Sequence, residues 1–234
     1  MKSIFVTGGA GFIGSHTCLL LLEKGYVIFI LDSFVNSSKK SLDRVSVILE
    51  DKGIDTKGRI FLINGDIRNS SDIEKVFQMS IKFKNKIQSV MHFAGLKSVF
   101  DSVIHPIEYW DNNVNGTIQL LKIMEKYGCT NIVFSSSATV YKAKTHNSIL
   151  ESDICEPVNP YGNTKLIIEK ILKDAYSSYP DKWRIASLRY FNPVGAHESG
   201  LIGEDPLDKP NNIYPRITRV AIGKMDSIKI FGSN

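Results

Sequence analysis

The sequence has few cysteines and no long hydrophobic run. Its 234 residues include three cysteines, Cys18, Cys129 and Cys155, which lie far apart and form no C-x-x-C pair. This spacing argues against a disulfide framework and against a zinc site, and it is typical of a protein in a reducing cytoplasm. No apolar segment approaches the roughly 20 residues that span a bilayer, and the glycines near the N-terminus are unlike a signal peptide.

Paired histidines and clusters of positive charge are also missing. The five histidines show no ligand spacing, so we expect no metal. The net charge is +5, but the lysines are dispersed, and we expect neither a nucleic acid nor a membrane as partner. A content of 43% hydrophobic and 23% charged residues is ordinary for a globular protein with one full-sized core.

Short apolar runs alternate with helical patterns along most of the chain. Strands are predicted at 3–8, 26–32, 59–65, 89–95, 131–137 and 184–191. Helices are predicted at about 12–24, 40–52, 71–83, 107–127 and 161–178. Six strands that alternate with helices predict an α/β fold, a doubly wound parallel sheet of the Rossmann type.

The composition changes after Phe191. The next residues, "NPVGAHESGLIGEDPLDKPNN", are rich in Gly, Pro, Asn and acidic residues, which predicts a long irregular segment of functional importance. A helix at about 213–224 and a last strand at 227–232 are predicted to follow. We therefore divide the chain into a dinucleotide-binding domain at 1–191 and the start of a substrate-binding region at 192–234.

A glycine-rich loop lies between the first predicted strand and the first predicted helix. In "TGGAGFIGSH", Gly9, Gly11 and Gly14 fit G-x-G-x-x-G, and Gly8, Gly11 and Gly14 fit G-x-x-G-x-x-G. Such a loop lets backbone amides approach a pyrophosphate at a helix N-terminus. The pattern alone is weak, and a tight turn remains the alternative.

Asp32 strengthens the dinucleotide interpretation. It ends the second predicted strand, 21 residues after Gly11, where a carboxylate would receive the adenosine ribose hydroxyls. A carboxylate would also repel a 2′-phosphate, so NAD is favoured over NADP. The alternative is an exposed acid beside a turn.

Tyr161 and Lys165 are four residues apart in "NPYGNTK", at the start of a predicted helix. Residues at this spacing share one helix face, so Lys165 could lower the pKa of Tyr161 and make it a proton acceptor. Ser137 ends the fifth predicted strand, and strand ends are where ligands bind in such sheets. A serine-rich turn near an exposed Tyr and Lys is the alternative.

Seven segments together resemble one known family. They are "TGGAGFIGSH", "NGDIR", "HFAGLKSV", "DNNVNGT", "FSSSATVY", "NPYGNTK" and "LRYFNPVGAH". In this order they resemble the extended short-chain dehydrogenase/reductase family and, within it, the UDP-glucose 4-epimerases. The resemblance implies a bound NAD, a UDP-sugar substrate, a homodimer, and inversion of the sugar at C4 by oxidation and re-reduction.

The resemblance also implies roles for individual residues. Tyr161, Lys165 and Ser137 would be catalytic. The implied cofactor-binding residues are Gly8, Gly11, Phe12, Ile13, Gly14, Asp32, Ser33, Phe34, Val35, Asn36, Ser37, Asp66, Ile67, Phe93, Ala94, Gly95, Leu96, Lys97, Asn112, Ser137, Tyr161, Lys165, Tyr190 and Phe191. The implied substrate-binding residues are Ser137, Tyr161, Phe191, Asn192 and Asn212.

Several positions depart from the family pattern. The related dehydratases carry an Asp-Glu pair where this chain has Ala138 and Thr139, so dehydration lacks its acid and base. Phe100 and Lys142 stand where glycine is common in the family, which adds bulk at the substrate edge and could favour other UDP-sugars or weaken substrate binding. The family also continues beyond "IFG", so we expect a small substrate domain that is only partial. The alternative to an epimerase is an NAD-binding module without turnover.

Overall fold

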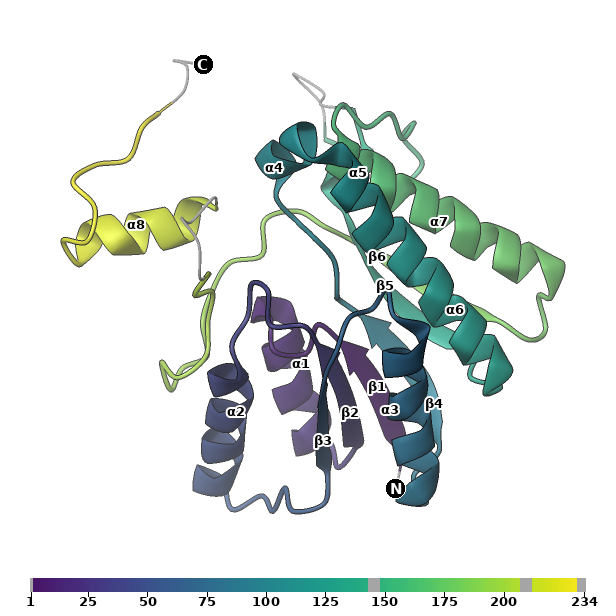
Figure 1. The fold of residues 1–234 in the computed structure, drawn as a ribbon. Helices are drawn as coiled ribbons and strands as arrows, with labels where there is room; N and C mark the ends of the chain where they lie inside the picture. The colour runs from purple at the N-terminus through teal and green to yellow at the C-terminus, as the bar shows by residue number, and fades with distance from the viewer. Residues whose placement is uncertain (1, 143–147, 207–211, 231–234) are drawn as a thin grey trace.

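Six strands form one parallel sheet in the computed structural model, which describes residues 2–142, 148–206 and 212–230 (Figure 1). The strands are β1 (Ser3–Thr7), β2 (Val27–Asp32), β3 (Ile60–Asn64), β4 (Ile87–His92), β5 (Asn131–Ser137) and β6 (Arg184–Tyr190). Their order is β3-β2-β1-β4-β5-β6, and each neighbouring pair is parallel. The predicted fold class, a doubly wound parallel sheet, is confirmed.

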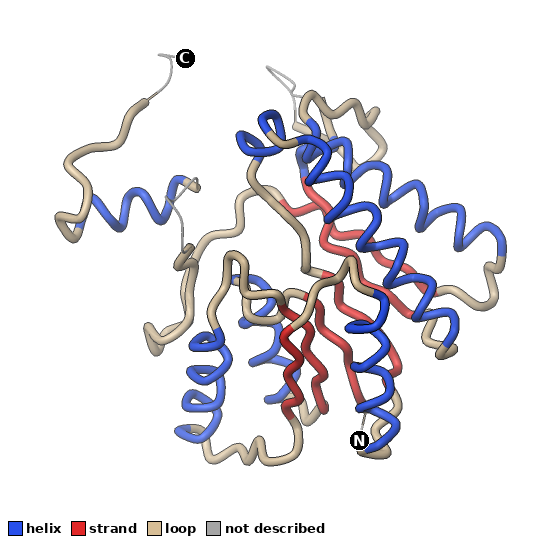
Figure 2. Tube along the Cα trace, viewed as in Figure 1, coloured by secondary structure: helices blue, strands red, loops and turns tan. Residues whose placement is uncertain are grey.

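Helices cover both faces of the sheet, as Figure 2 shows. The long helices are α1 (Phe12–Glu23), α2 (Lys39–Asp51), α3 (Ser70–Lys82), α6 (Gly116–Lys126) and α7 (Pro160–Ser178). Helices α1 and α2 share one hydrophobic cluster with β1 and β2. Helices α3, α6 and α7 pack into a second cluster on the opposite face.

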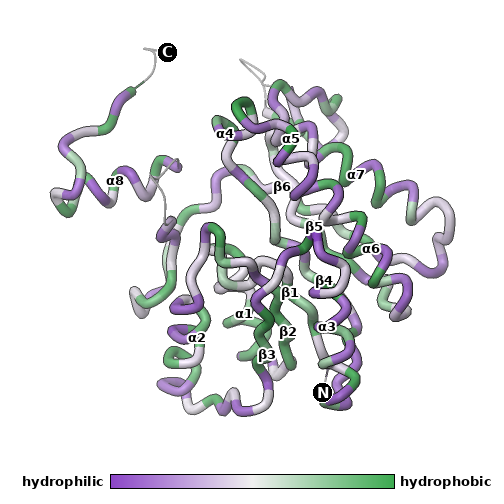
Figure 3. Tube along the Cα trace, viewed as in Figure 1, coloured by the Kyte–Doolittle hydropathy of each residue, from purple (hydrophilic) through white to green (hydrophobic). Residues whose placement is uncertain are grey.

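The alternation of side chains along β1 explains the two clusters. Ile4 and Val6 belong to the cluster with α1 and α2, whereas Phe5 belongs to the other. Successive side chains of a strand point to opposite faces, so a strand buried on both faces must be apolar throughout. Figure 3 shows this concentration of hydrophobic residues in the strands at the centre of the molecule.

The helix predicted at 107–127 differs from the observed structure. Residues 99–126 form α4 (Val99–Ile104), α5 (Pro106–Tyr109), a π-helix η1 (Trp110–Asn115) and then α6. Pro106 has no amide hydrogen to donate, so it stands at the first turn of α5 and separates it from α4. Single-turn π-helices are frequent at functional sites, and this one contains Asn112 and Asn113.

The segment after β6 is irregular as predicted over the described residues 191–206, apart from a bridge between Ala196 and Gly203. Ile202 anchors it by packing into the cluster of α1 and α2. Helix α8 (Ile213–Ala221) follows. The predicted strand at 227–232 is wrong over residues 227–230, which form no strand, and the rest of it lies outside the described residues. Ile230 is 86% exposed, and a strand requires a hydrogen-bonded neighbour.

Within the described residues, no helix has the length and apolar character needed to cross a membrane.

Candidate functional site

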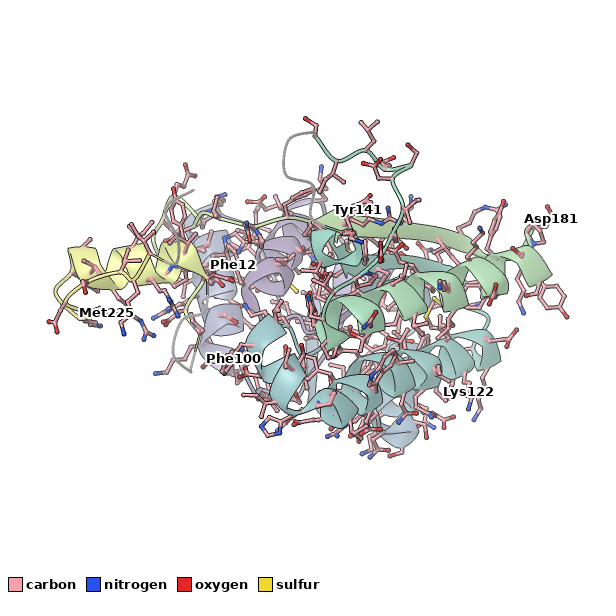
Figure 4. The ribbon with its side chains drawn as sticks, turned by 90° about the horizontal axis from the view of Figure 1, so that it is seen from above. Phe12, Phe100, Lys122, Tyr141, Asp181 and Met225 are labelled. Carbon is pink, nitrogen blue, oxygen red and sulfur yellow. The ribbon has the colours of Figure 1, made fainter. Side chains whose placement is uncertain are left out.

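The predicted site residues gather at one edge of the sheet. Because all six strands are parallel, the loops that follow them emerge on the same side, and the strand order reverses between β1 and β4. Such a switch point is where open α/β sheets bind ligands. Figure 4 views the molecule from above and shows Phe12, at the start of α1, between α8 and α7.

The glycine-rich loop is packed too tightly for side chains. A Cβ on Gly14 would lie 2.1 Å from the carbonyl oxygen of Gly8, and one on Gly8 would lie 2.7 Å from the amide nitrogen of Ala94. Gly8 also has a φ of +68°, which favours glycine. The N-cap of α1 is Gly11, which has no side chain to cap the helix. The amides of the first turn are therefore left for an anion.

Replacement of Gly14 by alanine is expected to lower the free energy of unfolding by about 3 kcal/mol, the upper part of the range for overpacking, because the clash is with backbone. Gly11→Ala is the matched control. Its Cβ would lie 3.4 Å from the Gly8 carbonyl oxygen, which is ordinary contact. Urea denaturation of both variants measures the difference. Equal stability of the two variants would contradict this packing of the loop.

Asp32 holds the glycine-rich loop against the segment that follows β2. Its Oδ2 accepts a hydrogen bond from the amide of Ala10 (2.9 Å). Its Oδ1 accepts from the amide of Phe34 (3.0 Å) and from the hydroxyl of Ser37 (2.8 Å). The carboxylate is 7% exposed. A carboxylate has about four acceptor positions, so capacity remains for a ligand hydroxyl.

Asp66 and Ile67 follow β3 at the same edge. Asp66 pairs with Arg68 (2.6 Å), and this hydrogen bond holds the pKa of the carboxyl below its usual value. Arg68 also pairs with Asp111 of the π-helix (3.1 Å). Ile67 is buried against Gly116, where a Cβ would lie 2.7 Å from the Ile67 side chain.

The segment Phe93–Lys97 is fixed by Asn113, which the sequence analysis missed. Asn113 is 3% exposed, and its Oδ1 accepts from the amide of Leu96 (2.8 Å). Its Nδ2 donates to the carbonyl of Leu96 (3.1 Å) and to the hydroxyl of Thr164 on α7 (3.0 Å). The neighbouring Asn112 was the residue predicted here. The segment "DNNVNGT" contained the signal, but three asparagines in it could not be distinguished without the register of the helix.

His92 connects the end of β4 to two other elements. Its Nδ1 lies 2.7 Å from the hydroxyl of Thr7 on β1, and its Nε2 lies 2.9 Å from the hydroxyl of Thr117 on α6. Burial lowers the pKa of His92 to about 3, so the ring is neutral at pH 7. The neutral ring therefore joins β4 to β1 and to α6 through these two hydroxyls.

Tyr161 and Lys165 share the first turns of α7. The helix begins with Asn159, whose side chain accepts from the amide of Gly162 (2.8 Å), and with Pro160 at its first position. The Nζ of Lys165 lies 5.7 Å from the centroid of the Tyr161 ring. The same Nζ donates to the carbonyl of Ser135 (2.8 Å).

Ser137 completes this group from β5. Its Oγ accepts from the amide of Thr139 (3.2 Å) and from the hydroxyl of Thr139 (3.0 Å), and its side chain opposes the rise in the pKa of Tyr161. Gly162 permits the close approach, since a Cβ there would lie 2.5 Å from the carbonyl oxygen of Thr139. The three residues predicted to be catalytic therefore lie together at the edge that carries the glycine-rich loop.

The pKa values of this group differ from the prediction. Burial raises the pKa of Tyr161, and the hydrogen bond with Ser137 opposes this by less. Burial also lowers the pKa of Lys165 to about 8. Lys165 was expected to lower the pKa of Tyr161. That direction is wrong for the ligand-free chain, because desolvation of the phenolate dominates.

The remaining predicted residues lie around this edge. Tyr190 ends β6, and burial raises its pKa. Phe191 is 65% exposed, and Asn192 beside it is also exposed. Asn212 is the N-cap of α8. Of the two departures from the family pattern, Phe100 on α4 is exposed, and Lys142 pairs with Glu156 (3.0 Å) at the surface.

Comparison with known proteins identifies the family. The sequence profile of a family described as GDP-mannose 4,6 dehydratase matches residues 5–234. The chain belongs to this family. Within the GDP-mannose 4,6-dehydratase family, its relatives include UDP-glucose 4-epimerase 2 of Arabidopsis thaliana, which is 47% identical over 233 residues. UDP-glucose 4-epimerase of Bacillus subtilis is 46% identical over 232 residues.

Solved structures of family members agree with the observed fold. A UDP-glucose 4-epimerase from Bifidobacterium longum, in complex with NAD+ and UDP, has a TM-score of 0.89 and 45% identity over 99% of this chain. The enzyme from Stenotrophomonas maltophila, with NAD and a formylated UDP-arabinopyranose, also has a TM-score of 0.89, with 40% identity. The resemblance to UDP-glucose 4-epimerases is therefore confirmed.

The chain is shorter than these relatives. It spans 64% of the Arabidopsis protein, 65% of the Bacillus protein and 65% of the Bifidobacterium chain, while nearly all of its own length is matched in each.

Proposed function

We propose that this chain carries the NAD-binding and proton-transfer machinery of a UDP-glucose 4-epimerase, which interconverts UDP-glucose and UDP-galactose. The observation that carries the proposal is the group of Tyr161, Lys165 and Ser137 at the strand edge that also holds the glycine-rich loop. Family relatives of this name, solved with NAD and UDP or with NAD and a UDP-sugar, support it.

The site residues fit NAD. The glycine-rich loop leaves backbone amides of α1 uncapped for a pyrophosphate, and Asp32 stands at the end of β2 for a ribose. The nicotinamide of a bound NAD would supply reversible hydride transfer at C4 of the sugar. The adenine would lie beside Asp66 and Ile67. Residues 93–97 and Asn112 would line the groove that holds the dinucleotide.

Residues of the chain would carry out the proton transfer. In its ionised form, Tyr161 would take the proton of the sugar 4-hydroxyl and later return it, while Ser137 holds the reacting oxygen by a hydrogen bond. Lys165 would place its positive charge beside the phenolate and help hold the nicotinamide ribose. Because the hydride returns to the same carbon on its other face, C4 is inverted with no net redox change.

Dehydration, the reaction that gives the family its description, is not proposed. Ala138 and Thr139 stand where the dehydratases carry an acid and a base. The hydroxyl of Thr139 is also engaged with Ser137. Neither residue can eliminate water from a keto sugar.

The remaining assignments are proposals on the same basis. Residues 1–191 would form the NAD-binding domain and residues 192–234 the start of the substrate-binding region, with Phe191, Asn192 and Asn212 contacting the UDP-sugar. A cytoplasmic location fits the unpaired cysteines.

We also propose a homodimer. It is supported by a groove between α6 and α7, partly lined by Leu121, Ile171 and Trp183, which would receive the helix pair of a second copy. Sedimentation is expected to give twice the mass of the chain, and a monomer at micromolar concentration would contradict this.

The proposal is tested by incubating the purified chain with NAD and UDP-galactose and measuring UDP-glucose. Turnover is expected, and UDP-N-acetylglucosamine and a UDP-uronic acid serve as competing substrates. Turnover of one of these alone would identify an epimerase for another UDP-sugar. Bound NAD without turnover of any sugar would favour the second candidate, an NAD-binding module, which the 64% coverage of the Arabidopsis relative makes a real alternative.

A further inference from the structure

Glu204 is a buried acid that neither the sequence analysis nor the proposed mechanism uses. Its side chain is only 8% exposed. One oxygen, Oε1, accepts from the Nζ of Lys97 (3.3 Å) and from the Nδ2 of Asn212 (2.5 Å). The other oxygen, Oε2, is buried and receives no hydrogen bond from the residues that the structure describes. A buried carboxylate is costly unless it is paired, so this contact requires an explanation.

The contact joins segments that are distant in sequence. Lys97 follows β4 and is separated from Glu204 by 107 positions. Glu204 follows the bridge between Ala196 and Gly203, and Asn212 begins α8. Lys97 is proposed to bind the cofactor and Asn212 to bind the substrate. Both therefore donate a hydrogen bond to the same carboxylate.

Asn212 is diverted from the usual role of an asparagine at its position. It is the N-cap of α8, yet its side chain makes no capping hydrogen bond. Asn69 and Asn159, the N-caps of α3 and α7, both cap their helices through the side chain. The side chain of Asn212 is instead held by Glu204, at the expense of helix capping.

Helix α8 is mostly exposed, with Pro215 as its buried residue. Figure 1 shows it standing apart from the sheet and from the helices that cover it. Its Arg219 donates to the carbonyl of Pro206 at 3.5 Å, which is a long hydrogen bond. The contact of Asn212 with Glu204 joins the start of α8 to Glu204 and, through Glu204, to Lys97.

We infer that Glu204 is a positioning residue that fixes Asn212, and with it the start of α8, against the loop that carries Lys97. Lys97 neutralises the buried carboxylate, and the carboxylate in turn orients Asn212 for the UDP portion of the substrate. The inference of a substrate role rests on the proposed function, but the link itself exists in the ligand-free chain.

Hydrogen exchange of the α8 amides tests the link without any ligand. Glu204→Ala is expected to speed exchange over residues 213–221 roughly tenfold, as the loss of one hydrogen bond to a charged group predicts. Glu23→Ala is the matched control. It breaks the pair of Glu23 and Lys52 (2.6 Å) at the end of α1 and should leave α8 unchanged.

The Lys97→Met variant tests whether Lys97 and Glu204 act together on α8 or whether Glu204 acts alone. It should also speed α8 exchange, because the carboxylate then lacks its counter-charge and turns toward solvent. Glu204→Gln should exchange at nearly the wild-type rate, since its amide oxygen still accepts from Asn212 and carries no charge. In the Glu204→Gln background, Lys97→Met should have no further effect. Wild-type or slower exchange of α8 in either Glu204→Ala or Lys97→Met would overturn the inference.

Calorimetric titration with UDP tests the substrate role. Glu204→Ala is expected to weaken UDP binding roughly tenfold, with rescue by Glu204→Gln to within about threefold of wild type. Unchanged UDP affinity in Glu204→Ala would overturn the positioning role. If the wild-type chain binds no UDP, the substrate part of the proposed function fails for this chain, and α8 exchange alone decides the link.

Discussion

Replacement of Tyr161 by phenylalanine is expected to lower the rate of UDP-galactose conversion by about 10²–10⁴-fold, the usual contribution of a positioned proton-transfer group. The phenyl ring keeps the packing of Tyr161 beside Lys165, where the Nζ lies 5.7 Å from the ring centroid. Only the hydroxyl is removed. The affinity for NAD should therefore stay within about twofold of the wild-type value. The substitution can alter at most one hydrogen bond to the cofactor, that of the phenol hydroxyl.

Tyr176→Phe is the matched control. It removes a hydroxyl from the same helix, but Tyr176 is 47% exposed and lies slightly more than four turns beyond Tyr161. Its turnover should equal that of the wild type. A Tyr161→Phe variant that retains the wild-type rate would show that the proton moves through another group, and the assignment of Tyr161 would be wrong.

Lys165→Met is expected to remove activity and yet stabilise the folded chain at pH 7. Lys165 is 5% exposed, and burial lowers its pKa from 10.5 to about 8. This shift corresponds to a cost of about 3 kcal/mol for holding the charge in the folded state. Methionine loses the hydrogen bond from the charged ammonium to the carbonyl of Ser135, worth about 2 kcal/mol. A net gain of about 1 kcal/mol in the free energy of unfolding is expected.

The advantage of Lys165→Met should disappear as the pH rises. Above pH 8 the folded wild type releases the Lys165 proton, whereas the unfolded chain keeps it up to pH 10.5. The unfolded state then binds more protons, so the stability of the wild type rises with pH relative to the variant. Urea denaturation at pH 7 and pH 10 measures both values, with the exposed Lys173→Met as control. A variant less stable than the wild type at pH 7 would show that the buried charge of Lys165 does not destabilise the folded chain.

The features that could be predicted from the sequence are those set by local patterns. The glycine-rich loop, the end of β2 at Asp32 and the start of α7 at Asn159 each depend on a few neighbouring residues. The parallel sheet follows from the alternation of strands and helices, and the sheet alone brings distant strand ends to one edge. For this reason the sequence was sufficient to place Tyr161, Lys165 and Ser137 together.

The features that could not be predicted depend on tertiary contacts. The π-helix at 110–115 accompanies the buried side chain of Asn113, which reaches both the β4 loop and α7. The strand predicted at 227–232 had a suitable pattern but finds no neighbouring strand among the described residues. A lowered pKa of Tyr161 was predicted from the spacing to Lys165, whereas burial decides the direction of the shift and raises the pKa. The contact of Glu204 with Lys97 spans 107 positions and has no local signature.

Calorimetric titration of the purified chain with NAD and with NADP tests the central claim most directly, because it depends only on the glycine-rich loop and Asp32. The account predicts that NAD binds, and that NADP binds at least about tenfold more weakly because Asp32 repels the 2′-phosphate. Failure to bind NAD, or equal binding of the two, would contradict the assignment of the loop and Asp32 as a dinucleotide site, and with it the proposed function.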